Sequence, residues 1–239
     1  MGLTEYQKKR RFGVTPEPAG KARRARRKRT LAFVVQKHCA SHLHYDFRLE
    51  WNGVLLSWAV PKGPSLDPAV KRLAMQVEDH PLEYAAFEGI IPAGEYGGGT
   101  VMIWDRGTWA PESPDVDAAL ARGELKFALD GEKLAGSWVL VRTRGYPSRG
   151  AAAGRPTWLL IKHRDDAASD DDIVETAPRS VVSKRLLAEI AWQEGGDVAR
   201  AAAGDPVSAL RTLVGDPAAV AAQKRRRKPS VWKSNKAGS

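Results

Sequence analysis

Polar and apolar side chains alternate in the segment HYDFRLEW, which covers residues 44–51. Successive residues of a β-strand point to opposite faces. His44, Asp46 and Arg48 are therefore expected to share one face, and the apolar residues between them the other. A solvated strand face more usually carries Thr, Ser, Lys and Glu. An imidazole, a carboxylate and a guanidinium on a single face therefore predict a functional site.

The histidine and aspartate of this strand belong to the donor set that divalent Mn, Fe or Zn accepts. A second imidazole is available from His38 or His42, and spacing alone leaves that choice open. Cys39 is expected to be incidental. The fork of donors on Arg48 suits a phosphate, and a metal beside it predicts phosphate-ester cleavage, because the metal lowers the pKa of its bound water. The structural alternative is a hydrogen-bonded surface pair of His44 and Asp46, with His38 capping a turn.

Further oxyanion donors are expected downstream. The segment RLAMQVEDH alternates in the same way, which predicts a strand over residues 72–79 with Arg72 and His80 on one face. His80 falls at the strand end, before a proline, and Tyr84 follows closely. Lys62 lies in the turn after the apolar run VLLSWAV. Donors fixed around a phosphoryl group each stabilise its developing charge by a few kcal/mol.

Short apolar runs between turn signals predict an all-β chain, folded as an antiparallel barrel or sandwich. Asn52-Gly53 between two such runs is a strong hairpin signal, and the glycines of GEYGGG are expected to make a tight turn, since the Walker A pattern is absent. The run SKRLLAEIAW has helical spacing. The expected strands are residues 33–37, 42–51, 54–60, 72–79, 100–110, 124–129, 136–143 and 157–163.

The charge is unevenly distributed along the 239 residues, whose net charge is +10. Residues 1–30 carry a net +9 and residues 224–239 a net +7, which leaves −6 for the middle. The basic runs 21–29 and 224–228 suit a polyanion such as nucleic acid, and no amphipathic apolar face accompanies them, which disfavours a membrane.

The expected organisation has three parts. They are a basic N-terminal arm (1–30), a barrel domain (31–175), and a helical and basic C-terminal tail (176–239). Part of the N-terminal arm is expected to fold onto the site, and both extensions are expected to be partly disordered. The single cysteine is compatible with a reducing cytosol, and no run is long and apolar enough for a membrane span. A cytoplasmic, nucleoid-associated protein is expected.

Three stretches of the chain resemble the 3′-phosphoesterase domain of bacterial ligase D. They are YQKKRRFGVTPEP, FVVQKHCASHLHYDFRLEWNGVLLSWAVPKGPS and KRLAMQVEDHPLEYAAFEGIIPAGEYGGGTVMIWDRGTW. The resemblance implies a small β-barrel that acts in non-homologous end joining. It implies a free-standing member, because 239 residues leave no room for ligase or polymerase domains.

The resemblance also implies a Mn²⁺-dependent enzyme, with Zn²⁺ or Co²⁺ as other candidate metals. Such an enzyme removes a 3′-terminal ribonucleoside from a primer-template and then the remaining 3′-phosphate. The implied partners are DNA or DNA/RNA 3′-ends, a separate ligase or polymerase, and an end-binding protein.

The residue roles that follow from the resemblance can be placed on this chain. The implied metal ligands are His38, His44 and Asp46; Arg48, His80 and Tyr84 would serve the phosphate, with Lys62 and Arg72 as supports; Arg10 and Glu17 would serve the phosphodiesterase step. The chain has Arg10-Arg11-Phe12 where the family motif is usually Arg-Asp-Phe. This departure bears on the ribonucleoside-removing step more than on the phosphatase step.

Two other functions fit parts of the pattern. His44, Asp46 and His80 form a His-x-Asp…His set, as in Fe(II) oxygenases, although His80 follows His44 by only 36 residues and no motif for an oxo-acid cosubstrate comes after it. The second is a non-catalytic DNA-end adaptor, whose basic arms recruit a repair ligase. An assay of phosphate release from a 3′-phosphorylated oligonucleotide, with Mn²⁺ and with a chelator, distinguishes the three hypotheses: phosphoesterase, oxygenase and adaptor.

Overall fold

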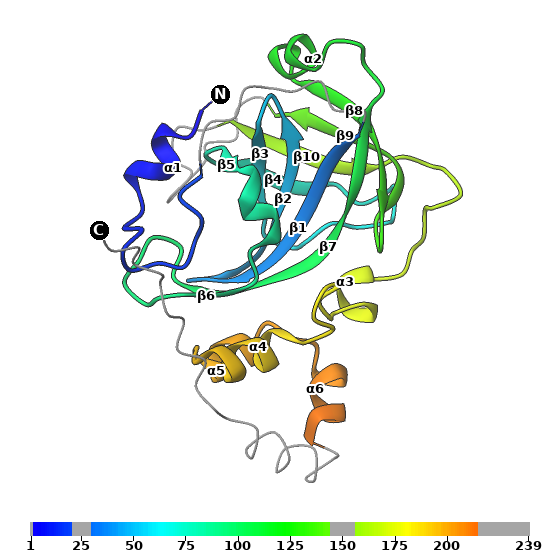
Figure 1. The fold of residues 1–239 in the computed structure, drawn as a ribbon. Coiled ribbons are helices and arrows are strands. Elements are labelled where there is room, and N and C mark those ends of the chain that lie inside the picture. The colour runs from blue at the N-terminus through cyan, green and yellow to red at the C-terminus, as the bar shows by residue number, and fades with distance from the viewer. Residues whose placement is uncertain (1, 21–29, 144–155, 215–239) are drawn as a thin grey trace. The chain divides into compact units, whose positions relative to one another are not determined.

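The computed structural model describes residues 2–20, 30–143 and 156–214 (Figure 1). The chain divides into two compact units, Met1–Asp205 and Pro206–Ser239. The described part of the second unit is a helix, α6 (Val207–Val214). The basic runs 21–29 and 224–228, and with them the expected disorder of the arms, lie outside the described residues.

The first unit is a closed barrel of eight antiparallel strands, which confirms the predicted fold class. The strand order is β1-β2-β3-β4-β10-β9-β8-β7, and the pairing of β1 with β7 closes the sheet. Two short strands are added at the side, β5 on β3 and β6 on β7. The strands are β1 (Leu31–Cys39), β2 (Leu43–Trp51), β3 (Val54–Val60), β4 (Arg72–Gln76), β5 (His80–Pro81), β6 (Gly89–Ile91), β7 (Gly99–Pro111), β8 (Glu124–Gly131), β9 (Ala135–Arg142) and β10 (Thr157–Lys162).

The barrel is filled by the apolar residues of the alternating strands. Tyr45, Phe47 and Leu49 of β2 are at most 3 % exposed and belong to one large core cluster with Trp58, Trp104 and other aromatic residues. The predicted hairpin is present between β2 and β3, where Asn52 and Gly53 both have positive φ (49° and 83°), as a type I′ turn requires. The inside of the barrel is therefore a packed core, and a site must lie elsewhere.

Short helices accompany the barrel in the described part of the chain. They are α1 (Thr4–Lys8), the 3₁₀ helix η1 (Leu82–Ala86), α2 (Val116–Arg122), α3 (Ile173–Thr176), α4 (Leu187–Glu194) and α5 (Val198–Ala202). The helical spacing of SKRLLAEIAW is borne out by α4, and Leu187, Ile190 and Ala191 of this helix pack in the barrel's core cluster. The end of α4 is a left-handed glycine, Gly195 (φ 80°), a usual C-terminal signal.

The N-terminal segment and η1 cover the outer face of β1–β3 (Figure 1). Tyr6 of α1, Leu55 of β3 and Tyr84 of η1 are all nearly inaccessible and form a second, small apolar cluster. This cover creates a buried layer outside the barrel wall, and it lies on the strand face that carries His44, Asp46 and Arg48.

The strand predicted over residues 72–79 is interrupted, and this changes which residues share a face. Trp58 of β3 is opposite Gln76, but Leu55 is opposite His80. Between these two pairs β3 advances by three residues, whereas the segment from Gln76 to His80 advances by four. The extra residue in that segment moves all later side chains to the other face of the sheet. Arg72 and His80 therefore do not share a face, contrary to the prediction.

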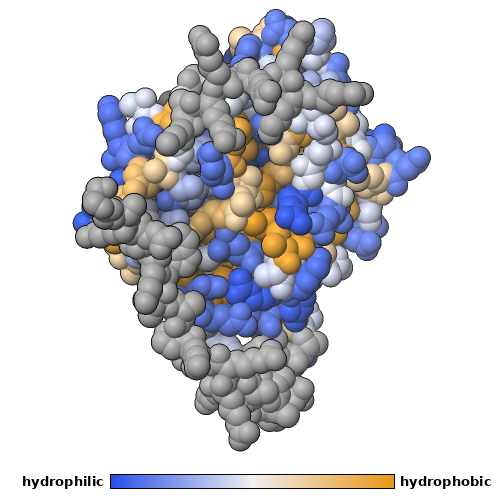
Figure 2. Space-filling view, in the orientation of Figure 1, coloured by the Kyte–Doolittle hydropathy of each residue, from blue (hydrophilic) through white to orange (hydrophobic). Residues whose placement is uncertain are grey.

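The large apolar residues exposed in the described part of the chain are Val14, Leu73, Val182, Val198 and Val207. Figure 2 shows hydrophilic residues over much of the visible face, with apolar ones between them. Within the described ranges, no helix is long and apolar enough to span a membrane.

Candidate functional site

Two neighbouring strands bring the predicted metal ligands together on the outside of the barrel. The antiparallel register of β1 and β2 places His38 opposite His44 and Gln36 opposite Asp46. The two imidazole rings have centroids 4.8 Å apart. The alternation predicted from the sequence is therefore present, and it carries these side chains away from the core.

The ligand atoms of His38, His44 and Asp46 all lie within 4.8 Å of one another. Asp46 Oδ2 is 3.5 Å from His38 Nδ1 and 3.7 Å from His44 Nε2. Two imidazole nitrogens and one carboxylate oxygen are a donor set for divalent transition metals. The cluster is a candidate metal site, and its separations leave room for a cation between the three atoms.

Hydrogen bonds to backbone carbonyls determine which ring nitrogens face this cluster. His38 Nε2 lies 2.8 Å from the carbonyl oxygen of Gly97, and His44 Nδ1 lies 3.0 Å from that of His42. Because a carbonyl only accepts, each of these nitrogens carries the proton. His38 Nδ1 and His44 Nε2 then point lone pairs toward Asp46. Three electron-rich atoms facing one another favour a cation, and a ring N–H donated to a backbone carbonyl is typical of metal-bound histidines.

The charge state of the cluster also favours metal binding. Burial alone would raise the pKa of the Asp46 carboxyl, but Arg48, His44 and His38 outweigh it, and its pKa lies far below the usual range. Burial lowers the pKa of His44, although Asp46 opposes this shift. An ionised carboxylate and a neutral imidazole are the forms that bind a metal.

Arg48 is fixed by contacts on three sides. Its Nε donates to Gln36 Oε1 (2.8 Å), one terminal nitrogen donates to Ser57 Oγ (2.8 Å), and the other lies 3.1 Å from Asp46 Oδ2. Its guanidinium also lies over the ring of Tyr84, 4.9 Å from the centroid. A guanidinium with so little freedom is a preorganised donor for an anion beside the metal site.

His80 is buried next to Arg48 and is neutral. Its Nδ1 donates to the carbonyl oxygen of Glu78 (2.8 Å), so its Nε2 accepts from Arg10 (3.2 Å). Burial, Arg48 and Arg10 together hold its pKa well below the usual value. The ring of Tyr84 packs 4.8 Å from that of His80, and burial raises the pKa of the Tyr84 hydroxyl well above its usual value.

The N-terminal segment adds a second buried charge network. Arg10 Nε donates to Glu17 Oε1 at 2.8 Å, and one of its terminal nitrogens lies 3.4 Å from Glu78 Oε1. Both side chains of the Arg10–Glu17 pair are almost inaccessible. Lys9 donates to Glu78 Oε2 at 3.1 Å. Arg10, which the resemblance implied for the site together with Glu17, thus contacts His80 and is paired with Glu17.

Not every predicted residue joins this arrangement. Lys62 is exposed after β3. Arg72 shares its face of β4 with Ala74, which lies in the core, and its buried Nε has no hydrogen-bond partner in the described structure. His42 is an exposed turn residue. Cys39 donates to the carbonyl of Arg200 (3.2 Å) on the other side of β1.

The oxygenase alternative is not supported by the position of His80. Among the described residues, the candidate metal group consists of His38, His44 and Asp46 and does not include His80. Both ring nitrogens of His80 already face other partners, a carbonyl and a guanidinium.

Sequence reasoning missed three polar residues that hold the site together: Gln36, Ser57 and Glu78. Gln36 is fully buried, and its Nε2 donates to the carbonyls of Tyr84 (3.1 Å) and Phe87 (2.9 Å) while its Oε1 accepts from Arg48. Gln36 lies two residues before His38, so the period of two that identified the site could have included it.

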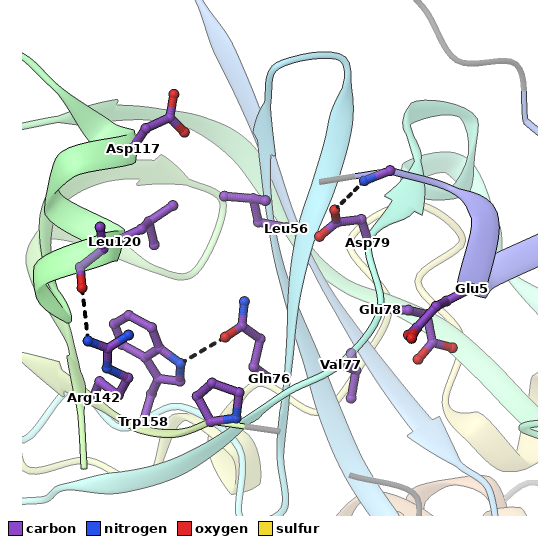
Figure 3. Close-up of a pocket in the computed structure, with 13 residues that line it drawn as sticks. Glu5, Leu56, Gln76, Val77, Glu78, Asp79, Asp117, Leu120, Arg142 and Trp158 are labelled. Atoms are coloured by element: carbon purple, nitrogen blue, oxygen red, sulfur yellow. Dashed lines mark hydrogen bonds between the residues drawn. The ribbon is translucent and has the colours of Figure 1, made fainter. Parts of the chain in front are cut away.

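A cavity of about 650 Å³ lies next to this site but is separate from it. Figure 3 shows α2 on one side and the Val77–Asp79 connection on the other, with Trp158 hydrogen-bonded to Gln76 between them. Glu5, Glu78, Asp79 and Asp117 contribute four carboxylates to the lining. Such a lining repels a phosphate backbone, so we do not consider the cavity a path for nucleic acid.

The molecule is thus a closed β-barrel protein that has, on its outer face, a candidate metal site and the guanidinium of Arg48 held by hydrogen bonds beside it. Comparison with known families agrees with this description. Residues 36–142 match the DNA ligase D 3′-phosphoesterase domain, a range that includes the candidate metal ligands. This part of the chain belongs to the 3′-phosphoesterase domain family of ligase D.

Curated relatives extend the similarity beyond that range. The chain is 55 % identical over 190 residues to the multifunctional non-homologous end joining protein LigD of Pseudomonas aeruginosa, an alignment that covers 77 % of this chain and 22 % of the relative. The corresponding values are 48 % over 143 residues (60 % and 18 %) for the LigD protein of Mycobacterium tuberculosis and 45 % over 198 residues (80 % and 24 %) for that of Mycolicibacterium smegmatis. The chain spans about a fifth of the length of these relatives.

Proposed function

We propose that the protein is a Mn²⁺-dependent phosphoesterase that heals DNA 3′-ends in bacterial non-homologous end joining. One observation carries this proposal. Two imidazole lone pairs and the Asp46 carboxylate converge on one point, and the guanidinium of Arg48 lies 3.1 Å from that carboxylate. A cation site and an anion donor this close together suit a phosphate ester, and membership of the family supports the same reaction.

The proposed chemistry assigns a role to each fixed side chain. His38, His44 and Asp46 would hold the metal, which supplies a polarised phosphoryl oxygen and a bound water of lowered pKa. Arg48 binds the non-bridging phosphate oxygens, and Tyr84, kept as a neutral phenol, donates a hydrogen bond to them. His80 carries its proton on Nδ1, and its Nε2 accepts a hydrogen bond from Arg10. Arg10 would therefore have to turn away from Nε2 before His80 could accept a proton at the reacting phosphate.

We assign removal of a 3′-terminal ribonucleoside to the same site, with Arg10 and Glu17 as its additional residues. Their buried pairing beside His80 supports this role. Lys62, exposed after β3, is proposed as an outer support. Arg72 shares the core face of β4 with Ala74, so any support from it would act through the strand and not by contact with the phosphate. Arg11 replaces the usual acidic residue of the motif, so we expect the diesterase step to be slower than the phosphatase step.

The proposed substrates are DNA or DNA/RNA 3′-ends of a primer-template, and the proposed setting is the nucleoid of the bacterial cytoplasm. Three curated relatives carry non-homologous end joining in their names, which supports a DNA ligase, a polymerase and an end-binding protein as partners. Zn²⁺ and Co²⁺ are alternative metals for the same donor set.

The test is phosphate release from a 3′-phosphorylated primer-template with Mn²⁺ and with chelator. His44→Ala and Asp46→Ala should abolish release while the purified variants keep their circular dichroism and cooperative unfolding. His42→Ala is the matched control, because only the backbone carbonyl of His42 contacts His44. Full activity in the His44→Ala or Asp46→Ala variant would refute the metal assignment.

The same assay tests the non-catalytic alternative. DNA binding without release of phosphate or nucleoside, with Mn²⁺, Zn²⁺ or Co²⁺, would identify a DNA-end adaptor instead of an enzyme.

A further inference from the structure

The loop between β6 and β7, residues 92–98, carries the carbonyl that orients His38. The Gly97 carbonyl accepts the hydrogen bond from His38 Nε2 (2.8 Å), and this bond leaves Nδ1 free to face Asp46. Gly97 has φ +78°, and a Cβ atom there would lie 3.6 Å from His38 Cε1. The loop therefore approaches the imidazole closely, and its position determines whether Nδ1 points at the metal site.

The loop has little of its own to hold it in place. Its sequence is PAGEYGG, and none of its residues is fully buried. Two backbone hydrogen bonds form its turns, Glu95 to Pro92 (3.2 Å) and Gly98 to Glu95 (3.0 Å). Glycine-rich backbone with few buried contacts has a high entropy cost of ordering. Contacts from outside the loop must therefore contribute to its conformation.

The N-terminal segment supplies those contacts. Arg11 donates from Nε to Glu95 Oε2 (3.2 Å) and from a terminal nitrogen to Glu95 Oε1, a two-pronged ion pair. Lys9 donates to the hydroxyl of Tyr96 (3.2 Å) and lies over its ring. Arg10, between them, is anchored by Glu17. The segment that carries Arg10 thus binds both polar side chains of the loop, Glu95 and Tyr96.

The two side chains of the Arg11–Glu95 ion pair differ in their solvent exposure. The Arg11 side chain is 72 % exposed, but that of Glu95 is only 5 % exposed. An exposed ion pair usually contributes little. Here, however, loss of Arg11 would leave a nearly buried carboxylate without its main partner, and the loop would have to move to hydrate it. An aspartate at position 11 would repel the same carboxylate.

From these contacts we propose that Arg11 and Glu95 are positioning residues for the metal site. Their ion pair fixes the 92–98 loop, the loop's Gly97 carbonyl fixes the tautomer and direction of His38, and His38 Nδ1 is thereby aimed at the metal. Position 11 then acts on metal binding, through the loop, and not by contact with substrate. This inference rests on the proposed metal site.

The experiment uses the full chain and two readouts. The first is Mn²⁺ affinity without substrate, from electron paramagnetic resonance titration of free Mn²⁺. The second is the tautomer of His38 in the metal-free protein, from ¹⁵N–¹H correlation spectra of the imidazoles. The variants are Arg11→Ala, Glu95→Gln, and the charge exchange Arg11→Glu with Glu95→Arg. Arg106→Ala is the matched control, because Arg106 forms an exposed ion pair with Glu132 elsewhere on the barrel.

Both single variants should bind Mn²⁺ about 3- to 10-fold more weakly. This loss is below the roughly 10- to 100-fold loss typical when the group hydrogen-bonded directly to a metal ligand is removed. They should also lose part of the Nε2–H tautomer, whereas the charge exchange restores both readouts and Arg106→Ala changes neither. Wild-type affinity and tautomer in Arg11→Ala and Glu95→Gln would overturn the proposal. So would weaker DNA binding in Arg11→Ala with both readouts intact, which would make Arg11 a substrate contact.

Failure of the proposed function itself gives a different result. A wild-type protein that binds no Mn²⁺ would refute the metal site, while the tautomer measurement on metal-free protein would still decide whether Arg11 and Glu95 orient His38. Loss of both readouts in the charge-exchange variant, with cooperative unfolding retained, would show that the two side chains act separately and would also overturn the proposal.

Discussion

Gln36 is the residue whose replacement should separate positioning of Arg48 from general stability. Its side chain makes three hydrogen bonds in a fully buried place, one to Arg48 and two to the carbonyls of Tyr84 and Phe87. Gln36→Leu removes all three and keeps a similar volume. The bond to the charged guanidinium is worth about 1.5–3 kcal/mol and each neutral bond about 0.5–1.5 kcal/mol. The free energy of unfolding should therefore fall by about 3–5 kcal/mol.

The effect on catalysis should be larger than stability alone explains. Removal of a transition-state donor costs about 100- to 1,000-fold in kcat, and Arg48 without Gln36 keeps its contacts with Ser57 and Asp46. We therefore expect kcat to fall by about 10- to 100-fold, with KM raised less. The measurements are steady-state release of phosphate from a 3′-phosphorylated primer-template with Mn²⁺, and urea unfolding of the same preparations.

Gln76→Leu is the matched control for this variant. Gln76 also accepts one hydrogen bond in a half-buried place, from Trp158 (3.1 Å), but contacts none of the proposed catalytic residues. It should lose about 1 kcal/mol of stability and keep its kcat within about twofold. A Gln36→Leu protein that is folded at the assay temperature and retains wild-type kcat would refute the role given to Gln36.

Three other predictions follow from the same contacts and charges. Arg48→Ala and His80→Ala should each lower turnover by at least about 100-fold while Mn²⁺ binding stays nearly intact; collapse of Mn²⁺ affinity would require new roles. Deleting residues 21–29 and 224–228 together, which spares Arg10 and Glu17, should weaken DNA binding and flatten its dependence on salt. Hydrolysis of a small phosphomonoester should stay unchanged, and deleting 229–239 alone should do little. An unaltered salt dependence of DNA binding in the double deletion would assign the arms to another partner. Burial raises the pKa of Asp105 to about 6 against its backbone hydrogen bonds. The folded state then binds this proton more tightly than the unfolded state, so stability is lost as the pH rises through that value. The unfolding free energy of the wild type relative to Asp105→Asn should therefore fall by about 2 kcal/mol from pH 4 to 6, and a constant difference in urea titrations would contradict this.

The part of the site on β2 could be predicted because it depends only on local geometry. A period of two in a strand assigns His44, Asp46 and Arg48 to one face whatever the strand pairs with. The Asn52-Gly53 turn fixes the next strand in the same way, since both residues accept positive φ. Composition and alternation predicted an all-β chain but left a barrel and a sandwich open, and the resemblance to the phosphoesterase family indicated the barrel. The eight barrel strands lie within a few residues of the expected ranges.

The faces of residues 72–80 could not be predicted by the same rule. Alternation assumes an unbroken strand, but β4 ends at Gln76 and His80 belongs to a separate bridge on β3. The extra residue between them reverses the faces, which takes Arg72 away from the site and brings His80 into it. Such an offset depends on the pairing partner, and nothing within the segment's own pattern reveals it.

The partner of Lys37 shows the limit of local reasoning more clearly. The alternation that turns His38 outward turns Lys37 and Cys39 toward the opposite side of β1, and a buried lysine requires an acidic partner. That partner is Asp205, 168 residues away, at 3.3 Å from Lys37 Nζ, with both side chains at most 1 % exposed. The sequence offers 28 acidic residues and no means to choose among them.

Asp205 also accepts hydrogen bonds from the backbone of Leu187 (3.3 Å) and Ala188 (2.9 Å) at the start of α4. It therefore ties the helical segment to Lys37, while the carbonyl of Arg200 holds Cys39. These two anchors stand immediately before and after His38 in the chain. A ligand held to within a fraction of an ångström needs a rigid strand beneath it. The segment that contains Leu187, Arg200 and Asp205 consequently supports the candidate metal site, because it restrains both neighbours of one proposed ligand.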